Sequence, residues 1–213
     1  MKLYNYWRSS SSYRVRIALH FKGVPFEYVA VNLLKGEHRH EPHRARNPVT
    51  AVPVLEVLEN GASFDISQSV AIAEYLEERY PERPLFPKAA TARASMRMCV
   101  ELINSGIQPF HNLSTLNHVR EQLKADEKAW AAHWVGVGLA SLETLAQRFA
   151  GSYLVGDAFT WADACLVPQL MGARRFGADV TKYPTLQRIE ATCLALEWVQ
   201  RAKPEAQPDA QPV

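Results

Sequence analysis

Four consecutive serines, Ser9 to Ser12, are the part of the sequence whose residue types and position could support chemistry. They lie between a segment predicted as a strand (residues 2–6) and one predicted as a helix (residues 13–22). The first turn of a helix has unpaired N–H groups and about half a unit of positive charge, so serine hydroxyls there favour a bound anion. A thiolate is one such anion, although serines in this place can also serve only as helix caps.

Two later segments contain polar groups in positions typical of ligand binding. Val52-Pro53 precedes a predicted strand, where a cis X-Pro bond can turn a backbone edge toward a peptide ligand. A trans proline at a strand start is the alternative. Gln68 and Ser69 lie in the first turn of another predicted helix, which favours a carboxylate, although an ordinary cap cluster would have the same residues.

These segments together resemble the amino-terminal domain of glutathione transferases, and the zeta class in particular. The matching motifs are Arg8-Ser9-Ser10-x-Ser12, Arg14-Val15-Arg16-Ile17-Ala18-Leu19, Gly106-Ile107-Gln108-Pro109 and Leu166-Val167-Pro168-Gln169. The resemblance covers nearly the whole chain. It implies a glutathione-dependent cis–trans isomerase that converts a maleyl keto acid, maleylacetoacetate or maleylpyruvate, to its fumaryl isomer in aromatic catabolism. A transferase that conjugates glutathione to electrophiles and a non-catalytic module of the same fold are the alternatives.

The resemblance also assigns roles to single residues. Ser9 is expected to donate a hydrogen bond to the sulfur of glutathione, with Ser10 and Ser11 assisting. Arg8 and Arg175 are expected to bind a carboxylate of the acidic substrate, because a guanidinium holds a carboxylate bidentately. The glutathione-binding residues that it implies are Ser9, Ser10, Ser11, Ser12, Tyr13, Arg14, His38, Val52, Pro53 (with a cis bond), Gln68, Ser69, Gln108, Asn112, Leu113 and Ser114.

The serine cluster departs from the class at one position. Zeta-class enzymes commonly carry Ser-Ser-Cys, and Ser11 stands in the cysteine position here. A hydroxyl is far less acidic than a thiol, so a mechanism that needs a protein thiolate at this position is excluded. The expected nucleophile is therefore the sulfur of glutathione itself.

Composition excludes several other classes of protein. A net charge of +2 does not indicate a nucleic-acid partner, and no apolar run is long enough for a membrane span. Three widely spaced cysteines predict neither a disulfide framework nor a zinc site, and no metal is expected at the histidine-rich segment 37–44. We expect a cytoplasmic protein with a small acidic substrate, and the resemblance implies a homodimer.

The elements that must position these residues form two predicted domains, an α/β domain over residues 1–80 and an all-helical domain over residues 88–213. Three prolines between residues 81 and 87 mark the linker. The resemblance implies that the first domain is thioredoxin-like. The remaining elements are a strand over 26–31, a hairpin of 54–57 and 63–64 around Asn60-Gly61, helices over 67–80, 88–116, 121–150, 161–175 and 185–202, a capping box from Thr160 to Asp163, and a loosely packed end over 203–213.

Overall fold

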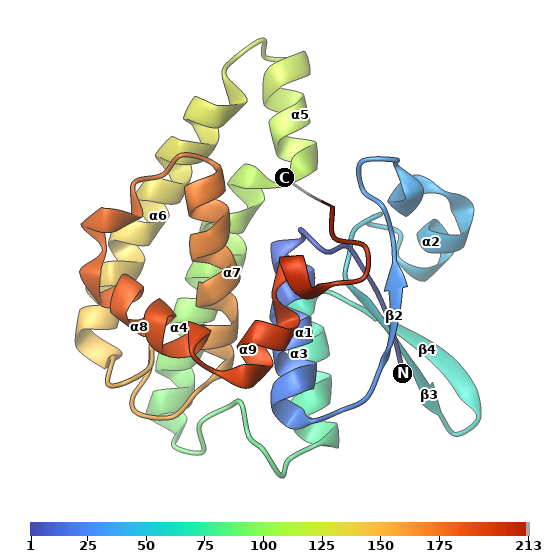
Figure 1. The fold of residues 1–213 in the computed structure, drawn as a ribbon, viewed down its shortest axis with the longest axis horizontal. Coiled ribbons are helices and arrows are strands. Elements are labelled where there is room, and N and C mark those ends of the chain that lie inside the picture. Colours follow the sequence, from blue (N-terminus) through green and yellow to red (C-terminus); the bar gives the residue numbers. More distant parts are fainter. Residues whose placement is uncertain (212–213) are drawn as a thin grey trace. The chain divides into compact units, whose positions relative to one another are not determined.

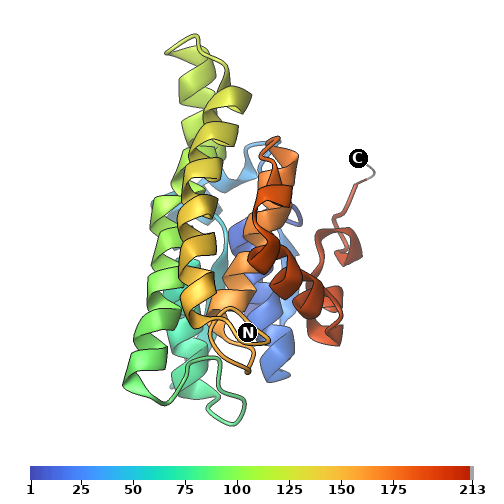
Figure 2. The ribbon, with the colours of Figure 1, turned by 90° about the vertical axis from the view of Figure 1, so that its left-hand side faces the viewer.

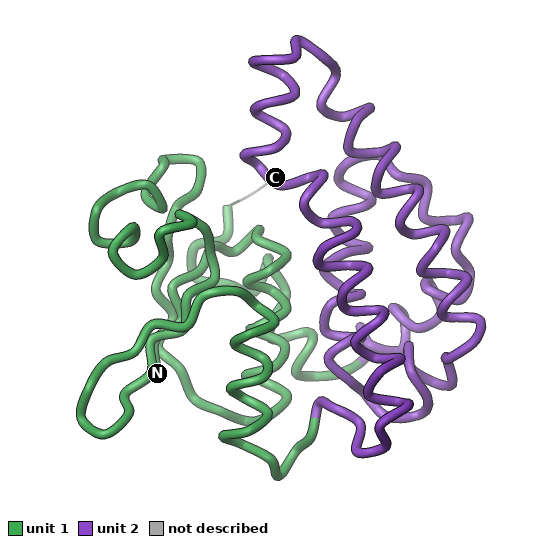
Figure 3. The backbone as a smooth tube through the Cα atoms, turned by 180° about the vertical axis from the view of Figure 1, so that it is seen from behind, with its two compact units in different colours: residues 1–84, 196–213 green, residues 85–195 purple. Residues whose placement is uncertain are grey.

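The computed structural model describes residues 1–211, which divide into two compact units (Figure 3). The first unit contains residues 1–84 and the segment from residue 196 onward, and the second contains residues 85–195. The break after residue 84 lies inside the predicted linker. The second unit ends at residue 195, whereas the sequence prediction extended it to residue 213.

The first unit is built on a four-stranded mixed sheet in the order β2-β1-β3-β4. Strand β1 (Lys2–Asn5) pairs in parallel with β2 (Glu27–Ala30) and antiparallel with β3 (Val54–Glu59), which pairs antiparallel with β4 (Ala62–Ser67). The predicted turn between β3 and β4 is confirmed, since Asn60 and Gly61 have φ values of 52° and 81°. This order of strands and helices confirms the predicted α/β class.

The helices of this unit begin and end at residues with clear local causes. Helix α1 (Ser10–Lys22) begins earlier than predicted because Ser9 caps it, and Gly23 ends it in the left-handed conformation. Helix α2 (Glu41–Arg46) follows the short 3₁₀ turn η1 (Glu37–Arg39), and α3 (Ser69–Arg79) follows β4. Helices α1 and α3 pack side by side, and α9 (Glu197–Ala202) packs on α1 (Figure 1).

The carboxyl-terminal segment packs closely on the first unit, so the expectation of a loosely packed end is wrong for residues 203–210. The guanidinium of Arg16 is fully buried and donates to the Ala202 carbonyl over 3.0 Å. After the 3₁₀ turn η4 (Pro204–Ala206), the buried amide of Gln207 donates to the carbonyls of Arg201 and Lys203. Further along, the Asp209 carboxylate accepts a hydrogen bond from the Trp7 N–H over 3.2 Å. The contacts of Arg16 and Trp7 explain why the segment belongs to the first unit.

The second unit, residues 85–195, consists of helices joined by turns and loops, with no strand beyond one isolated bridge between Ala150 and Gly156. The long helices α4 (Ala90–Gly106) and α6 (Glu127–Phe149) run side by side (Figure 2). Helix α7 (Trp161–Arg175) packs on both α4 and α8 (Pro184–Leu194). The predicted helix over 88–116 is interrupted after Gly106, and the one over 185–202 is interrupted after Leu194. No helix among the described residues is long and apolar enough to cross a membrane. The other elements of this unit are η2 (Gln108–His111), α5 (Leu113–Glu121) and η3 (Val180–Lys182).

Helix α7 starts at the predicted capping box. The fully buried Asp163 carboxylate accepts hydrogen bonds from the Thr160 N–H, the Thr160 hydroxyl and the Leu154 N–H at 2.8 to 2.9 Å. Burial raises the pKa of Asp163 to about 6, although these hydrogen bonds favour the ionised form. The box therefore joins the start of α7 to the preceding loop.

Asp163→Ala is expected to lower the free energy of unfolding by about 2 kcal/mol or more, because it removes a helix cap and leaves buried N–H groups without an acceptor. Chemical denaturation measures the change. Asp126→Ala is the matched control, since Asp126 caps α6 at an exposed position and its loss is expected to cost about 1 kcal/mol. Equal losses in the two variants would contradict this account of Asp163.

Candidate functional site

Ser9 caps α1 in a geometry that leaves its hydroxyl proton available. Its Oγ accepts a hydrogen bond from the Ser12 N–H over 3.2 Å, and its own N–H donates to the Tyr6 carbonyl over 3.0 Å. The side chain is half-buried. A hydroxyl that accepts one hydrogen bond is polarised and becomes a better donor in another. Ser9 is thus suited to donate to an anion at the helix terminus.

The rest of the serine cluster divides into a half-exposed and a buried part. Ser10 and Ser11 are half-buried, in the first turn of α1. The side chains of Ser12, Tyr13 and Arg14 lie in the core. Arg14, in the second turn of α1, donates from Nη1 to the Ser69 hydroxyl over 3.4 Å, so α1 is joined to the first turn of α3 below the surface.

The Val52-Pro53 peptide bond is cis, which confirms the expectation from the resemblance. Within residues 1–211, no hydrogen bond is made to the backbone N–H or C=O of Val52. The preceding carbonyl, that of Ala51, accepts hydrogen bonds from His43 Nε2 and Asn47 Nδ2, both at 2.9 Å. Because the Ala51 carbonyl and the Val52 N–H belong to one planar peptide unit, these two buried side chains also fix the direction of the Val52 N–H.

Gln68 stands at the N-terminus of α3 with an exposed side chain and a φ of 73°. A positive φ is uncommon for a residue other than glycine, and such strain is concentrated at binding sites. Ser69, the first residue of α3, is buried. The pair combines a side-chain amide, a hydroxyl and free helix N–H groups, all of which can bind a carboxylate.

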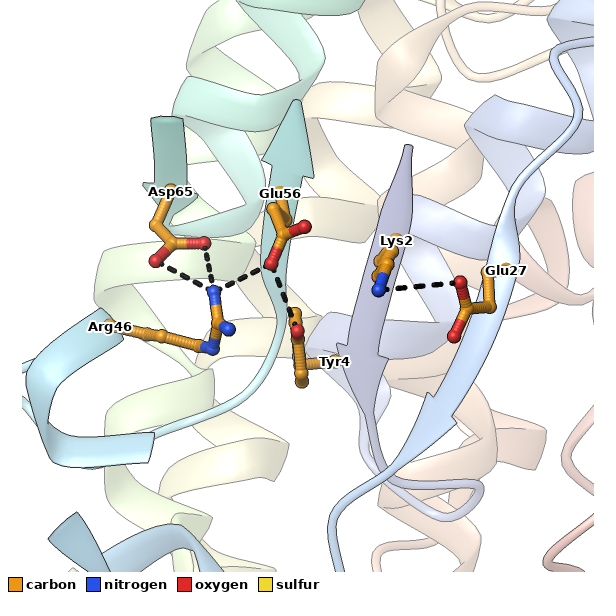
Figure 4. A network of polar contacts seen from close by, with 6 residues as sticks. All are labelled: Lys2, Tyr4, Glu27, Arg46, Glu56 and Asp65. Atoms are coloured by element: carbon orange, nitrogen blue, oxygen red, sulfur yellow. Dashed lines mark hydrogen bonds and ion pairs between the residues drawn. The ribbon is translucent and has the colours of Figure 1, made fainter. Parts of the chain in front are cut away.

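A polar network anchors the loop that carries Val52 (Figure 4). Arg46, at the end of α2, donates from Nη1 to Glu56 over 2.7 Å and to Asp65 over 2.9 Å. The Tyr4 hydroxyl donates to the same Glu56 carboxylate, and the Arg46 guanidinium lies 4.3 Å from the Tyr4 ring centroid. The network fastens α2 to β1, β3 and β4, and so fixes one end of the loop over 47–53.

His38 lies in η1 with a buried side chain, and its Nδ1 has no hydrogen-bond partner among the described residues. Burial, together with the nearby Arg39 charge, holds the pKa of His38 below its usual value, so the ring is neutral near pH 7. Across residues 1–211, no three His, Cys, Asp or Glu side chains gather as a possible metal site.

The candidate residues of the second unit lie at the η2–α5 junction and at the end of α7. Gln108 is buried, and Asn112 occupies the N-cap position of α5 without a side-chain capping hydrogen bond. The next two residues, Leu113 and Ser114, are exposed. Arg175 is exposed, with its guanidinium 5.3 Å from the Phe176 ring centroid.

His111 had no assigned role in the sequence analysis, and it forms a buried polar pair. Its Nε2 lies 3.2 Å from the amide nitrogen of Gln169, and its ring packs 5.1 Å from that of Phe176. The pair joins η2 to α7. The Gln169 position in the Leu166–Gln169 motif is the sequence signal that could have indicated it.

The three cysteines, Cys99, Cys165 and Cys193, are buried free thiols. Burial raises the pKa of Cys99 to about 12 and shifts the pKa of Cys193 upward as well. Neither is ionised near pH 7. Because Ser11 replaces cysteine at the helix start, none of these protein thiols is placed to act as a nucleophile there.

Two family models match the chain. The model of the glutathione S-transferase N-terminal domain matches residues 1–78, and that of the glutathione S-transferase C-terminal domain matches residues 128–205. The two matches fall on the sheet unit with the serine cluster and on the helices from α6 onward.

Relatives with known names are similar over nearly their whole length. A maleylacetoacetate isomerase from Mus musculus is 44% identical over 209 residues, which cover 97% of this chain and 94% of the relative. A solved maleylacetoacetate isomerase from Anaeromyxobacter dehalogenans, with glutathione bound in its active site, has 48% identity and a TM-score of 0.92, covering 99% of this chain and 97% of that one. A bacterial maleylpyruvate isomerase described as a zeta-class glutathione transferase has 42% identity and a TM-score of 0.93, covering 99% of this chain and 100% of that one.

Proposed function

The chain belongs to the glutathione S-transferase family, in its zeta class, and we propose that its serine cluster activates glutathione for the cis–trans isomerisation of a maleyl keto acid. A glutathione-dependent isomerase of the maleylacetoacetate or maleylpyruvate type is the enzyme class of its relatives. The observation that carries the proposal is the geometry of Ser9, a half-buried cap whose oxygen accepts from Ser12 and whose proton is left to donate.

The groups of the first unit fit glutathione by their chemistry. The backbone N–H and C=O of Val52, next to the cis bond to Pro53, pair with the peptide of the cysteinyl unit. Gln68 and Ser69 bind the γ-glutamyl end, where the N-terminus of α3 favours a carboxylate. In this arrangement the Ser9 hydroxyl donates a hydrogen bond to the sulfur of glutathione.

When bound, glutathione supplies a thiolate that adds to the cis double bond and leaves after rotation, so that it acts as a catalyst. Ser9 stabilises the thiolate by a hydrogen bond, with Ser10, Ser11 and the N-terminus of α1 adding to the field. A thiol pKa lowered by about two units corresponds to roughly 2.7 kcal/mol of preference for the thiolate. One hydrogen bond to the thiolate and the positive end of the α1 dipole together can supply a preference of this size.

Further residues bind the two ligands. Arg8 and Arg175 hold a carboxylate of the substrate. The remaining glutathione contacts are assigned to Ser12, Tyr13, Arg14, His38, Gln108, Asn112, Leu113 and Ser114. For the three buried residues of α1, burial favours an indirect role, such as the support that Arg14 gives to Ser69.

We propose a homodimer that acts in the cytoplasm on a small acidic substrate, without nucleic acid or membrane partners. The resemblance supports the dimer, and exposed apolar side chains at Phe64 of β4 and Met98 of α4 offer surface for it. The near-neutral net charge of +2 supports the lack of a nucleic-acid partner.

The test of this proposal follows a maleyl keto acid by proton NMR with and without glutathione. The wild type should form the fumaryl isomer when glutathione is present. Arg175→Gln should raise the KM for the keto acid by about tenfold or more, because one charge-assisted contact is lost, while the Kd of glutathione changes little.

Arg174→Gln is the matched control, because Arg174 forms a bidentate ion pair with Glu190 of α8, at 2.6 and 2.5 Å. This change should lower stability and leave the KM near the wild-type value. If Arg175→Gln weakens glutathione and keto acid binding equally, Arg175 does not bind the substrate carboxylate.

A further inference from the structure

The turn that carries Ser9 is held by two charged side chains from elsewhere in the first unit. Arg16 donates to the Trp7 carbonyl over 3.0 Å and to the Tyr6 carbonyl over 3.4 Å. The Trp7 N–H donates to Asp209 Oδ2 over 3.2 Å, across 202 positions of sequence. The backbone just before Ser9 is therefore held at the Trp7 N–H by Asp209 and at the Tyr6 and Trp7 carbonyls by Arg16.

Asp209 is itself fixed by a second contact. Its Oδ1 accepts a short hydrogen bond from the Tyr28 hydroxyl of β2. Burial is the main reason that the pKa of Tyr28 is raised, so the phenol keeps its proton and remains a donor at any working pH. The carboxylate thus bridges the sheet edge and the turn before Ser9, and charge-assisted bonds of this kind are among the stronger ones.

Ala210, the residue after Asp209, packs against an apolar cluster that contacts both the segment before Ser9 and the segment before Pro53. This cluster contains Tyr6, Trp7, Val31 and Val52, and Ala210 packs against it. Figure 1 shows the segment after α9 running beside the start of α1. Trp7 precedes the serine cluster and Val52 precedes the cis proline, so one small cluster lies under both ligand-binding segments.

We propose that Asp209 is a positioning residue of the glutathione site, which acts through the Trp7 backbone to set the place of the Ser9 hydroxyl. The inference rests on the proposed role of Ser9. Asp209 contacts the backbone of the turn and the Tyr28 phenol. Without its carboxylate, the turn loses one of its two anchors, and a donor displaced by a fraction of an ångström stabilises an anion less well.

The experiment compares Asp209→Ala, Asp209→Asn and Tyr28→Phe with the wild type, and uses Glu205→Gln as the control. Glu205 is an exposed carboxylate in the same segment. The pKa of the thiol of bound glutathione is read from the ultraviolet absorbance of the thiolate, glutathione Kd comes from calorimetry, and stability from thermal unfolding.

Asp209→Ala should raise the pKa of the bound thiol by about one unit, which is a tenfold loss of thiolate at a given pH, and lower kcat near neutral pH by about tenfold. The Kd of glutathione, measured at a pH where the thiol is protonated, should stay within about threefold of the wild-type value, because Val52, Gln68 and Ser69 are retained. Asp209→Asn, which keeps an acceptor oxygen, and Tyr28→Phe, which keeps the carboxylate, should cause smaller shifts in the same direction.

A merely structural role would lower the unfolding temperature of Asp209→Ala and leave the thiol pKa and kcat of the folded protein unchanged, which would overturn the inference. An equal pKa shift in Glu205→Gln would also overturn it. A wild type that does not lower the thiol pKa would contradict the proposed role of Ser9 and the inference with it. A lowered thiol pKa in the wild type that persists in all three variants would overturn the inference alone.

Discussion

Ser9→Ala should lower kcat by about a hundredfold while the Kd of glutathione stays near the wild-type value, because the variant loses the donor to the sulfur and keeps the other contacts. A hundredfold loss of rate is the usual effect of removing one preorganised hydrogen-bond donor to a negative charge. Val52, Gln68 and Ser69 hold the rest of the tripeptide. Stopped-flow or steady-state kinetics with a maleyl keto acid, together with calorimetry, separate the two quantities.

Two variants separate the loss of the donor from the loss of the helix cap. Ser9→Thr keeps a hydroxyl that can both cap α1 and donate, so it should recover most of the rate. Asp126→Ala removes a cap from α6 at comparable cost in stability and should keep the wild-type kcat. A Ser9→Ala enzyme with the full rate would show that another group stabilises the sulfur.

Ser69→Ala should have the opposite effect: the Kd of glutathione should rise about ten- to hundredfold, and kcat at saturating glutathione should stay nearly unchanged. The expected rise in Kd follows because a hydrogen bond to a charged group contributes about 1.5 to 3 kcal/mol. Ser69 Oγ stands at the first residue of α3 and is supported from below by Arg14. The change removes a contact to the γ-glutamyl end, which does not react.

Ser67→Ala is the matched control for Ser69. Ser67 is the last residue of β4, two positions earlier, and is half-buried. Its removal should leave the Kd within about twofold of wild type, as for most surface substitutions away from a site. If Ser69→Ala lowered kcat and left the Kd unchanged, Ser69 would belong to the reacting centre and not to the binding of the tripeptide.

Features with a local cause could be predicted from the sequence. The helix end at Gly23, the turn at Asn60-Gly61 and the capping box from Thr160 to Asp163 each depend on contacts within a few residues. Helix propensity and capping act over the same short range, so residue type and spacing are sufficient to indicate them. The same holds for α7, whose predicted range of 161–175 is the observed one.

Features that depend on tertiary contacts could not be predicted in this way. Arg46 joins Glu56 and Asp65 across three elements, and Asp209 reaches Trp7 across 202 positions. The segment 203–213 is rich in proline and polar residues, which is typical of a loose end. Periodicity holds no information on the contacts of Asp209 with Tyr28 of β2 and with the turn before α1. The break of the predicted helix 88–116 after Gly106 was missed because the apolar pattern continues through η2.

The central claim is that glutathione is a catalyst whose thiolate adds to the double bond and leaves again in each turnover. Its most direct test is the thiol balance during conversion of a large excess of a maleyl keto acid with a trace of glutathione. The account predicts many equivalents of fumaryl isomer per glutathione, with free thiol constant from the first turnover to the last. Loss of one free thiol for each substrate consumed would contradict it and establish a conjugating transferase.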